Sequence, residues 1–381
     1  MTDAPAHVVE PDLPVARARA LHEQLDAAAA ATPVGDPVPR SSIDLLAQAD
    51  LLGLMVPAAV GGQELPLTEI VDVYAEVSRA DGSLGWCHFA ADSAAAYFGA
   101  YLDDDGVAEV FADGVPLVAG QFAPNGTATV DGDDLIVTGD YQFGSGIAHA
   151  SWAGAGILTQ PEGDDPGAYV FACFPVGLAE LDGNWDVLGL QATASWDYHV
   201  RDVRVPRRWA FDFFAPTVHR GGPLYRLGVL PLTAAGHAGW AIGVTRRILD
   251  EARAIAAGTT RLGAGTSLAD SERFLYEYGV LEGRFRAGRA WVREVCADAE
   301  EEARLHGAVS LTTANLVREA CRHVNQEGAD IARQLYLLCG TRALRDGPIQ
   351  RCFRDLHAGS QHFFASPAAA VDLARALLDE A

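Results

Sequence analysis

The sequence predicts an α+β protein, mainly α-helical, in which a β-rich middle segment separates two helical parts. At 381 residues the chain is too long for one compact core of ordinary size, so several domains are expected. Roughly the first 115 residues, and those after about residue 225, carry apolar side chains at helical spacing, whereas short β-rich runs lie between them. We therefore predict an N-terminal helical domain over residues 1–115, a β domain over 116–215 and a C-terminal four-helix bundle over 216–381.

Three helices are predicted in the N-terminal part. An alanine-rich segment over 15–31 has Leu21 and Leu25 at helical spacing. The second helix follows Ser42, which we expect to be its N-cap because a serine hydroxyl can accept from a free backbone N–H. The third helix, over 67–83, has one apolar face. That face consists of Ile70, Val71, Tyr74 and Val77.

Turn signals divide the middle segment into short strands. The Asp131-Gly132 pair between TATV and DDLIVTG is a strong signal for a β-hairpin, and Asn125-Gly126 is a second turn signal. The run YHVRDVRVP alternates and ends at Pro206. We expect about 100 residues of antiparallel sheet, arranged as a small barrel or sandwich.

Long periodic segments predict the C-terminal bundle. They cover residues 239–257, 272–305 and 311–340, and short loops connect them. Short connections favour antiparallel neighbours, so we expect these helices to pack together as a bundle.

Composition excludes several classes of function. The chain has 51 acidic and 28 basic residues, all of the latter arginine, and a formal charge of −23. A protein with this much negative charge repels phosphate backbones and anionic membranes. Nucleic acids and membranes are therefore not expected partners. The six cysteines are scattered with no CxxC pair, which predicts reduced thiols and no metal site. With no secretory signal and no long apolar run, we expect a cytoplasmic protein.

Common nucleotide and hydrolase motifs are missing. GSGIAHA at 144–150 resembles a dinucleotide-binding loop, but His149 stands at the third glycine position and a strand is expected to follow. The sequence also has no P-loop, no GxSxG elbow and no HExxH motif. No nicotinamide-binding domain is therefore expected within this chain.

Four local patterns, in this order along the chain, resemble one known family. They are LMVPAAVGGQEL, GDYQFGSGIAHASW, LGLQATASWDYHVRDVRVP and IQRCFRDLHAGSQH. Together with the helical–β–helical order, they resemble the acyl-CoA dehydrogenase superfamily from about residue 40 onward. The resemblance implies the acyl-CoA dehydrogenase-like fold.

Within that superfamily the sequence is more similar to the flavin-dependent monooxygenases than to the dehydrogenases. Many dehydrogenases carry a glutamate base eight residues after the Asp of the R-D pair, where this chain has Phe363 after Asp355. The monooxygenase branch commonly has a histidine near this place, and His362 precedes Phe363. DGSLGW at 81–86 also resembles that branch.

The resemblance implies a reduced-flavin-dependent monooxygenase that hydroxylates a small aromatic or amine substrate through a flavin hydroperoxide. Its cofactor would be FADH2 or FMNH2, with O2 as co-substrate. It would depend on a separate NAD(P)H:flavin reductase and assemble as a homotetramer. Two alternatives stay open: an acyl-CoA dehydrogenase or oxidase with a displaced base, and a flavin-binding relative without turnover. The substrate, and the choice between FMN and FAD, also stay open.

The same resemblance implies roles for individual residues. His362 would be the catalytic base, because an imidazole transfers protons near neutral pH, and His88 is the alternative base. Ser145 would contact the flavin near N5, and Phe143 would pack on the isoalloxazine. The remaining cofactor contacts implied are Gln121, Thr193, Ser195, Arg261 and Gly340. Structural roles compete with these: Ser145 as a strand end, Phe143 as sheet core, Arg261 as a solvated residue and Gly340 as a helix C-cap.

Overall fold

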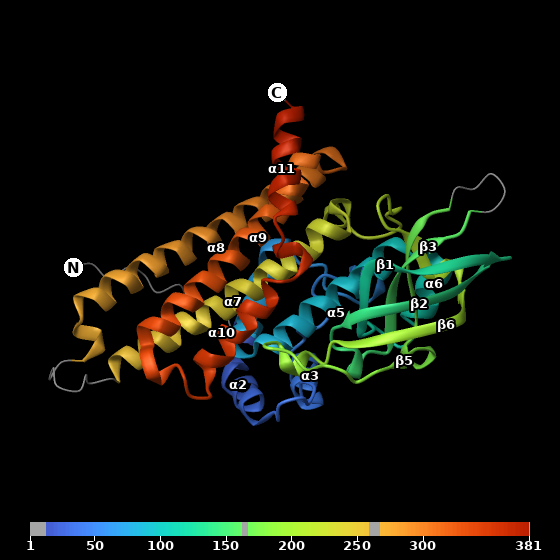
Figure 1. The fold of residues 1–381 in the computed structure, drawn as a ribbon. Helices are drawn as coiled ribbons and strands as arrows, with labels where there is room; N and C mark the ends of the chain where they lie inside the picture. Colours follow the sequence, from blue (N-terminus) through green and yellow to red (C-terminus); the bar gives the residue numbers. More distant parts are fainter. Residues whose placement is uncertain (1–12, 162–166, 259–266, 381) are drawn as a thin grey trace.

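The computed structural model describes residues 13–161, 167–258 and 267–380, and it confirms the helical–β–helical order. Figure 1 shows the sheet at one end of the molecule, the long C-terminal helices at the other, and α5 between them. Neither a helix long and apolar enough to cross a membrane nor a group of side chains suited to a metal ion occurs in these ranges.

From residue 13 onward, the N-terminal part forms six α-helices. Their bounds are α1 Pro14–Ala20, α2 His22–Ala31, α3 Arg40–Gln48, α4 Leu67–Ala80, α5 Gly82–Tyr101 and α6 Asp104–Val110. The predicted helix over 15–31 is interrupted at Leu21. The predicted N-cap at Ser42 is wrong, because α3 begins directly after the extended Pro39 and Ser42 lies buried in its first turn.

Helix α5 is the central element of the N-terminal part. Its N-cap Asp81 accepts from the backbone N–H of Ser83 at 2.9 Å, which satisfies one of the free donors at the helix start. Most of its side chains are buried, on all faces. A helix that is apolar all round belongs in an interior, and α5 lies between α4, α7 and the start of the sheet.

Seven strands form one mixed sheet in the order β5-β6-β2-β1-β3-β4-β7. Their bounds are β1 Val118–Asp131, β2 Asp134–Gly144, β3 Trp152–Thr159, β4 Tyr169–Pro175, β5 Glu180–Leu181, β6 Trp196–Pro206 and β7 Ala210–Asp212. The β1–β2 hairpin is confirmed: Asp131 pairs with Asp134, and Gly132 has a φ of 62° in the turn.

Two expectations for the sheet need correction. The sheet is not wholly antiparallel, because β3 pairs parallel with β1. The chain leaves β2 at the end of the sheet where β1 begins, and Ser151 donates there to the backbone oxygen of Leu117, so β3 starts beside the start of β1. Asn125-Gly126 is not a turn between strands; it lies within β1, where the pairing with β3 shifts between Gln121 and Gly126.

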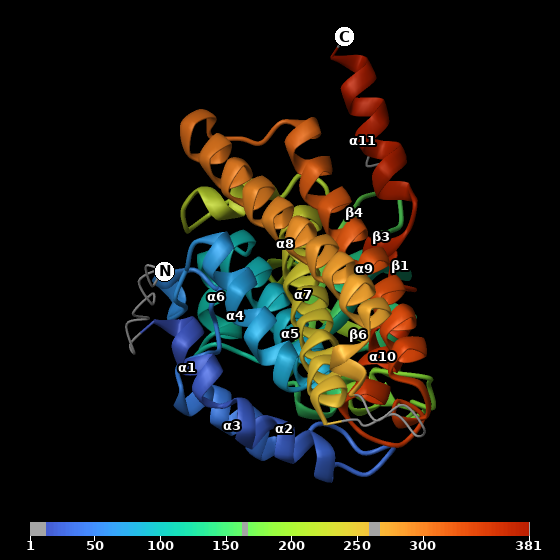
Figure 2. The same ribbon diagram turned by 90° about the vertical axis from the view of Figure 1, so that its left-hand side faces the viewer.

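The C-terminal part is built from long packed helices. Their bounds are α7 Val229–Ala257, α8 Glu272–His306, α9 Leu311–Cys339, α10 Pro348–Gly359 and α11 Ala368–Asp379. Helices α7 to α10 pack together, and α11 projects beyond them at the carboxyl end (Figures 1 and 2). One continuous apolar core joins these helices to the N-terminal ones, and a second core lies within the sheet.

Candidate active site

Four hydrogen bonds connect α5 to the loop that precedes β6. Ser145, just after β2, accepts from the indole Nε1 of Trp86 at 3.0 Å, and its Oγ lies 2.8 Å from the Oγ of Ser195. The Oγ of Ser195 lies 2.7 Å from the Oγ1 of Thr193, which donates to the backbone oxygen of Leu190 at 2.8 Å. We call this series the hydroxyl chain. It brings together three of the predicted cofactor residues from two separate segments.

The loop before β6, which contains Thr193 and Ser195 of the hydroxyl chain, has a strained backbone. Leu190 has a φ of 57° and Ala194 a φ of 44°, values that non-glycine residues adopt only when their surroundings impose them. Asp355 of α10 accepts from the backbone N–H of Leu190 at 2.6 Å. Gly189 lies so close to α10 that a Cβ would fall 2.2 Å from the backbone oxygen of Arg354. The R-D pair of α10 therefore holds the loop in place.

Burial raises the pKa of the Asp355 carboxyl to about 7, the hydrogen bond from Leu190 lowers it in part, and the Asp81 carboxylate raises it further. The native state thus holds this proton over a pH range in which the unfolded chain has lost it. Because the native state then binds more protons, the contribution of Asp355 to stability falls as pH rises from about 4 to about 7.

We expect Asp355→Asn to gain stability relative to wild type at pH 8 but not near pH 4. The amide keeps an oxygen for the N–H of Leu190 and removes the buried charge. Urea unfolding at both pH values measures the difference. Asp355→Ala, which lacks that oxygen, is expected to be less stable at both. An Asn variant with the same deficit at both pH values would contradict the assignment.

Phe143 presents its ring to solvent instead of to the sheet core. It has a φ of 61°, and 56% of its surface is exposed. The ring meets Trp185 edge to face, with centroids 6.1 Å apart. An exposed aromatic face beside a partly exposed serine hydroxyl fits a flat, partly polar ligand such as an isoalloxazine.

His362 lies at the start of the short 3-10 helix Phe363–Ala365. Its Nδ1 accepts from the backbone N–H of Phe364 at 3.5 Å. The ring lies edge to face against Trp86 at 5.3 Å and against His237 at 5.1 Å between centroids. Burial lowers its pKa to about 4, so the imidazole is neutral at physiological pH.

His237 of α7 joins this group of rings, although the sequence analysis did not single it out. It is fully buried, and neither ring nitrogen has a hydrogen-bond partner among the described residues. The ring stacks on Phe89 at 5.7 Å and meets Trp86 edge to face at 4.9 Å. Burial, with His362 nearby, holds its pKa well below the usual value. The one available signal was a histidine within the otherwise apolar run AAGHAGWAIG.

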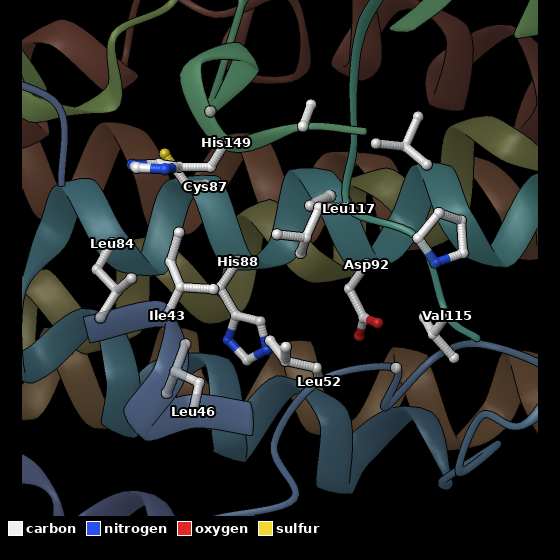
Figure 3. Close-up of a pocket in the computed structure, with 16 residues that line it drawn as sticks. Ile43, Leu46, Leu52, Leu84, Cys87, His88, Asp92, Val115, Leu117 and His149 are labelled. Atoms are coloured by element: carbon white, nitrogen blue, oxygen red, sulfur yellow. The ribbon is translucent and has the colours of Figure 1, made fainter. Parts of the chain in front are cut away.

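His88 lies on a different face of α5 from Trp86. Its Nε2 bonds to the backbone oxygen of Leu51 at 2.6 Å, and burial lowers its pKa to about 4. With Asp92 it lines a mainly apolar cavity of about 50 Å³ (Figure 3). The structure therefore places His88 apart from the hydroxyl chain and from His362.

The other predicted cofactor residues do not join the hydroxyl chain. The Oε1 of Gln121 accepts from Asn125 Nδ2 at 3.0 Å and from the backbone N–H of Gln142 at 3.1 Å, so it braces the irregular part of β1. Gly340 ends α9 with a φ of 63°, in the helical bundle and not on the sheet. Arg261 lies outside the described residues.

Comparison with known families places this site in context. Residues 16–104 match the model of the acyl-CoA dehydrogenase N-terminal domain, and residues 235–367 match that of the C-terminal domain. Together the two matches cover more than half of the chain. The chain belongs to the acyl-CoA dehydrogenase family.

Over most of its length, this member of the acyl-CoA dehydrogenase family is similar to flavin-dependent oxygenases. It is 26% identical over 333 residues to an indole-3-acetate monooxygenase of Acinetobacter baumannii. That alignment covers 87% of this chain and 85% of the relative. It is 24% identical to the oxygenase component of an FADH2-dependent resorcinol hydroxylase of a Rhizobium species, covering 85% and 84%. A crystal structure of a 3-HSA hydroxylase from a Rhodococcus species superposes with a TM-score of 0.88, at 22% identity and 96% coverage of both chains.

These comparisons confirm two expectations. The solved structure confirms the acyl-CoA dehydrogenase-like fold. The relatives confirm the monooxygenase branch: this acyl-CoA dehydrogenase family member is a reduced-flavin-dependent monooxygenase, and hence an oxidoreductase.

Proposed function

We propose that this oxygenase binds reduced flavin against Phe143 and the hydroxyl chain, and hydroxylates a small aromatic substrate beside His362. One observation carries the proposal. Trp86 joins the two halves of the site, because its N–H bonds to Ser145 on the sheet side while its ring contacts His362 and His237 on the helical side. A cofactor group and a proton-transfer group thus meet at one side chain.

The flavin would be held by the sheet side. Phe143 offers an exposed ring for the isoalloxazine, and Ser145 lies next to it at the partly exposed end of the hydroxyl chain. Thr193 and Ser195 are buried, so their hydroxyls act through Ser145. Bound reduced flavin supplies the electrons that activate O2.

The substrate would lie on the helical side, against aromatic rings. Trp86, Phe89 and Trp240 surround His237 and His362 there, with ring centroids 4.9 to 5.7 Å apart. Among the described residues, burial is the main cause of both lowered pKa values, and the one further cause is His362, which lowers the pKa of His237. An uncharged region lined by rings favours a neutral aromatic group that carries an O–H or N–H.

His362 would remove the proton of that O–H or N–H. A neutral imidazole has one lone pair, which lies on Nδ1 when that nitrogen accepts from Phe364. This contact is long, at 3.5 Å, so the ring would give it up when Nδ1 takes the substrate proton, whereas a protonated histidine has no lone pair to offer. The dehydrogenase alternative gains no support from position 363, where that branch would carry its glutamate base. Phe363 has a half-exposed apolar ring there, which cannot act as a base.

We expect product formation to require an added NAD(P)H:flavin reductase. With reductase, NADH, flavin and O2, the protein should convert indole or a phenol to a hydroxylated product; with NADH and flavin alone it should not. The reason is that no nicotinamide-binding motif occurs in the sequence. Chromatographic product analysis measures both reactions. Sustained turnover with NADH and no reductase would contradict the proposal.

The protein is expected to assemble as a homotetramer through the C-terminal helices. Large apolar side chains are exposed on them: Leu275 at 56%, Tyr276 at 74% and Leu337 at 65%. Apolar surface of this kind marks an interaction face, and association of copies would cover it. Light scattering at micromolar concentration tests this, and a mass near 40.3 kDa, that of one chain, would contradict it.

A further inference from the structure

The two ends of the hydroxyl chain determine the direction of every hydrogen bond within it. At one end the indole N–H of Trp86 can only donate, and at the other the backbone oxygen of Leu190 can only accept. The proton between Thr193 and Leu190 must therefore come from Thr193. It follows that Ser195 donates to Thr193 and that Ser145 donates to Ser195. Four contacts use four protons, one from the indole and one from each hydroxyl.

This direction leaves Ser145 without a free proton. Its one hydroxyl proton lies toward Ser195, and one lone pair accepts from Trp86. Ser195 and Thr193 are 2% and 1% exposed, so Ser145, which is partly exposed, is the member of the chain that can meet a bound molecule. To such a molecule it offers a lone pair and no donor.

The N5 atom of flavin is a hydrogen-bond donor in one redox state and an acceptor in the other. Reduced flavin carries a proton on N5 and donates there, whereas oxidised flavin has a lone pair on N5 and accepts. We infer that the hydroxyl chain makes the site selective for reduced flavin, because Ser145 accepts from N5–H but faces an oxidised N5 with lone pair against lone pair. The inference rests on the proposed function, which places Ser145 at N5.

The size of the effect follows from hydrogen-bond energetics. One state gains a hydrogen bond and the other leaves two acceptors facing each other, so binding should differ by roughly tenfold to hundredfold. Tighter binding of the reduced form raises the midpoint potential of bound flavin, by about 30 mV for each factor of ten in a two-electron couple. The selectivity is a property of Thr193 and Ser195 as much as of Ser145.

Two substitutions at one position test the inference. Thr193→Val keeps the shape and removes the hydroxyl, so Ser195 loses its acceptor and is free to donate to Ser145. The proton of Ser145 then becomes available to oxidised N5. Thr193→Ser is the matched control, because its hydroxyl can still donate to Leu190. Dissociation constants are measured by titration with oxidised FAD and FMN, and anaerobically with the same flavins after dithionite reduction.

We expect Thr193→Val to lower the ratio of oxidised to reduced dissociation constants about tenfold, mainly through tighter oxidised binding, and Thr193→Ser to keep the wild-type ratio. Ser195→Ala should act like Thr193→Val, since it frees the same Ser145 proton by removing its acceptor directly. Thermal unfolding verifies that each variant is folded. An unchanged ratio in both Thr193→Val and Ser195→Ala, or equal weakening of both redox states, would overturn the inference alone. Failure of wild type to bind either state would overturn the proposed function as well.

Discussion

Replacing His362 with alanine is expected to abolish hydroxylation while reduced-flavin binding and oxygen uptake survive. Loss of a general base typically lowers the rate by about 10²- to 10⁴-fold. In the proposed arrangement flavin would be held by the sheet side of the site, which His362 does not contact through any hydrogen bond among the described residues. Oxygen that is still reduced without product should appear as hydrogen peroxide, so product and peroxide are measured together.

Two further variants separate the base from a structural role of His362. The ring also caps a short helix by accepting from Phe364, and His362→Asn preserves an acceptor there without a usable base. We expect the Asn variant to lose product as the Ala variant does. His357→Ala is the control, because the Nδ1 of His357 bonds to the backbone oxygen of Phe353 in its own helix. Full product yield in the Asn variant would show that His362 acts only as a cap.

The pH dependence gives an independent check on the same residue. Since burial lowers the pKa of His362 to about 4, its neutral form persists well below pH 6. The loss of rate on acidification that belongs to this group should therefore fall near pH 4 and not near pH 6.5, the ordinary histidine value. A limb at pH 6.5 that disappears in His362→Asn would place this imidazole in a more solvated setting.

Trp86→Ala is expected to reduce the free energy of unfolding by about 3–5 kcal/mol, the usual range for removing a buried tryptophan. Only 7% of Trp86 is exposed, and its ring is 4.9 to 5.3 Å from four others. The variant should also lose coupled hydroxylation, because the same ring joins the cofactor side to the substrate side. Urea unfolding and product yield measure the two effects.

Trp86→Phe separates the effect on stability from the effect on hydroxylation. It keeps an aromatic ring and removes the N–H that Ser145 accepts, so stability should fall by only about 1 kcal/mol. Trp291→Ala is the control, since Trp291 lies on α8 against His323 and touches neither the hydroxyl chain nor His362. If Trp86→Ala proves no less stable than Trp291→Ala, the packing argument fails.

The sequence was sufficient for the order of elements because helical and strand periodicities are local. The hairpin at Asp131-Gly132 was predictable for the same reason, since a two-residue turn determines its own pairing. The parallel pairing of β3 with β1 was not, because it depends on where the chain re-enters the sheet after β2. Asn125-Gly126 was predicted to be a turn, but the pair lies within β1, at a shift in its pairing with β3.

Part of the candidate site was also predictable. Motif resemblance identified Ser145, Thr193, Ser195 and His362, and the structure brings the first three into one hydrogen-bonded series. It did not identify His237 or Trp86 as partners, because they meet only when α5 and α7 pack together. His88 follows Trp86 by two residues, and a helix turns about 200° over that distance, so the two side chains diverge.

The family, the branch and the residue types available for flavin and proton transfer follow from the chain alone, since spacing and side-chain chemistry do not depend on folding. Which of those groups meet, and in which protonation state, depends on how the helices and the sheet pack. Burial is a property of the packed molecule; it lowers the pKa of His362, and together with the nearby His362 it lowers that of His237. The direction of the hydroxyl chain likewise depends on Trp86 and Leu190, which are more than 100 residues apart, standing at its two ends in the folded protein.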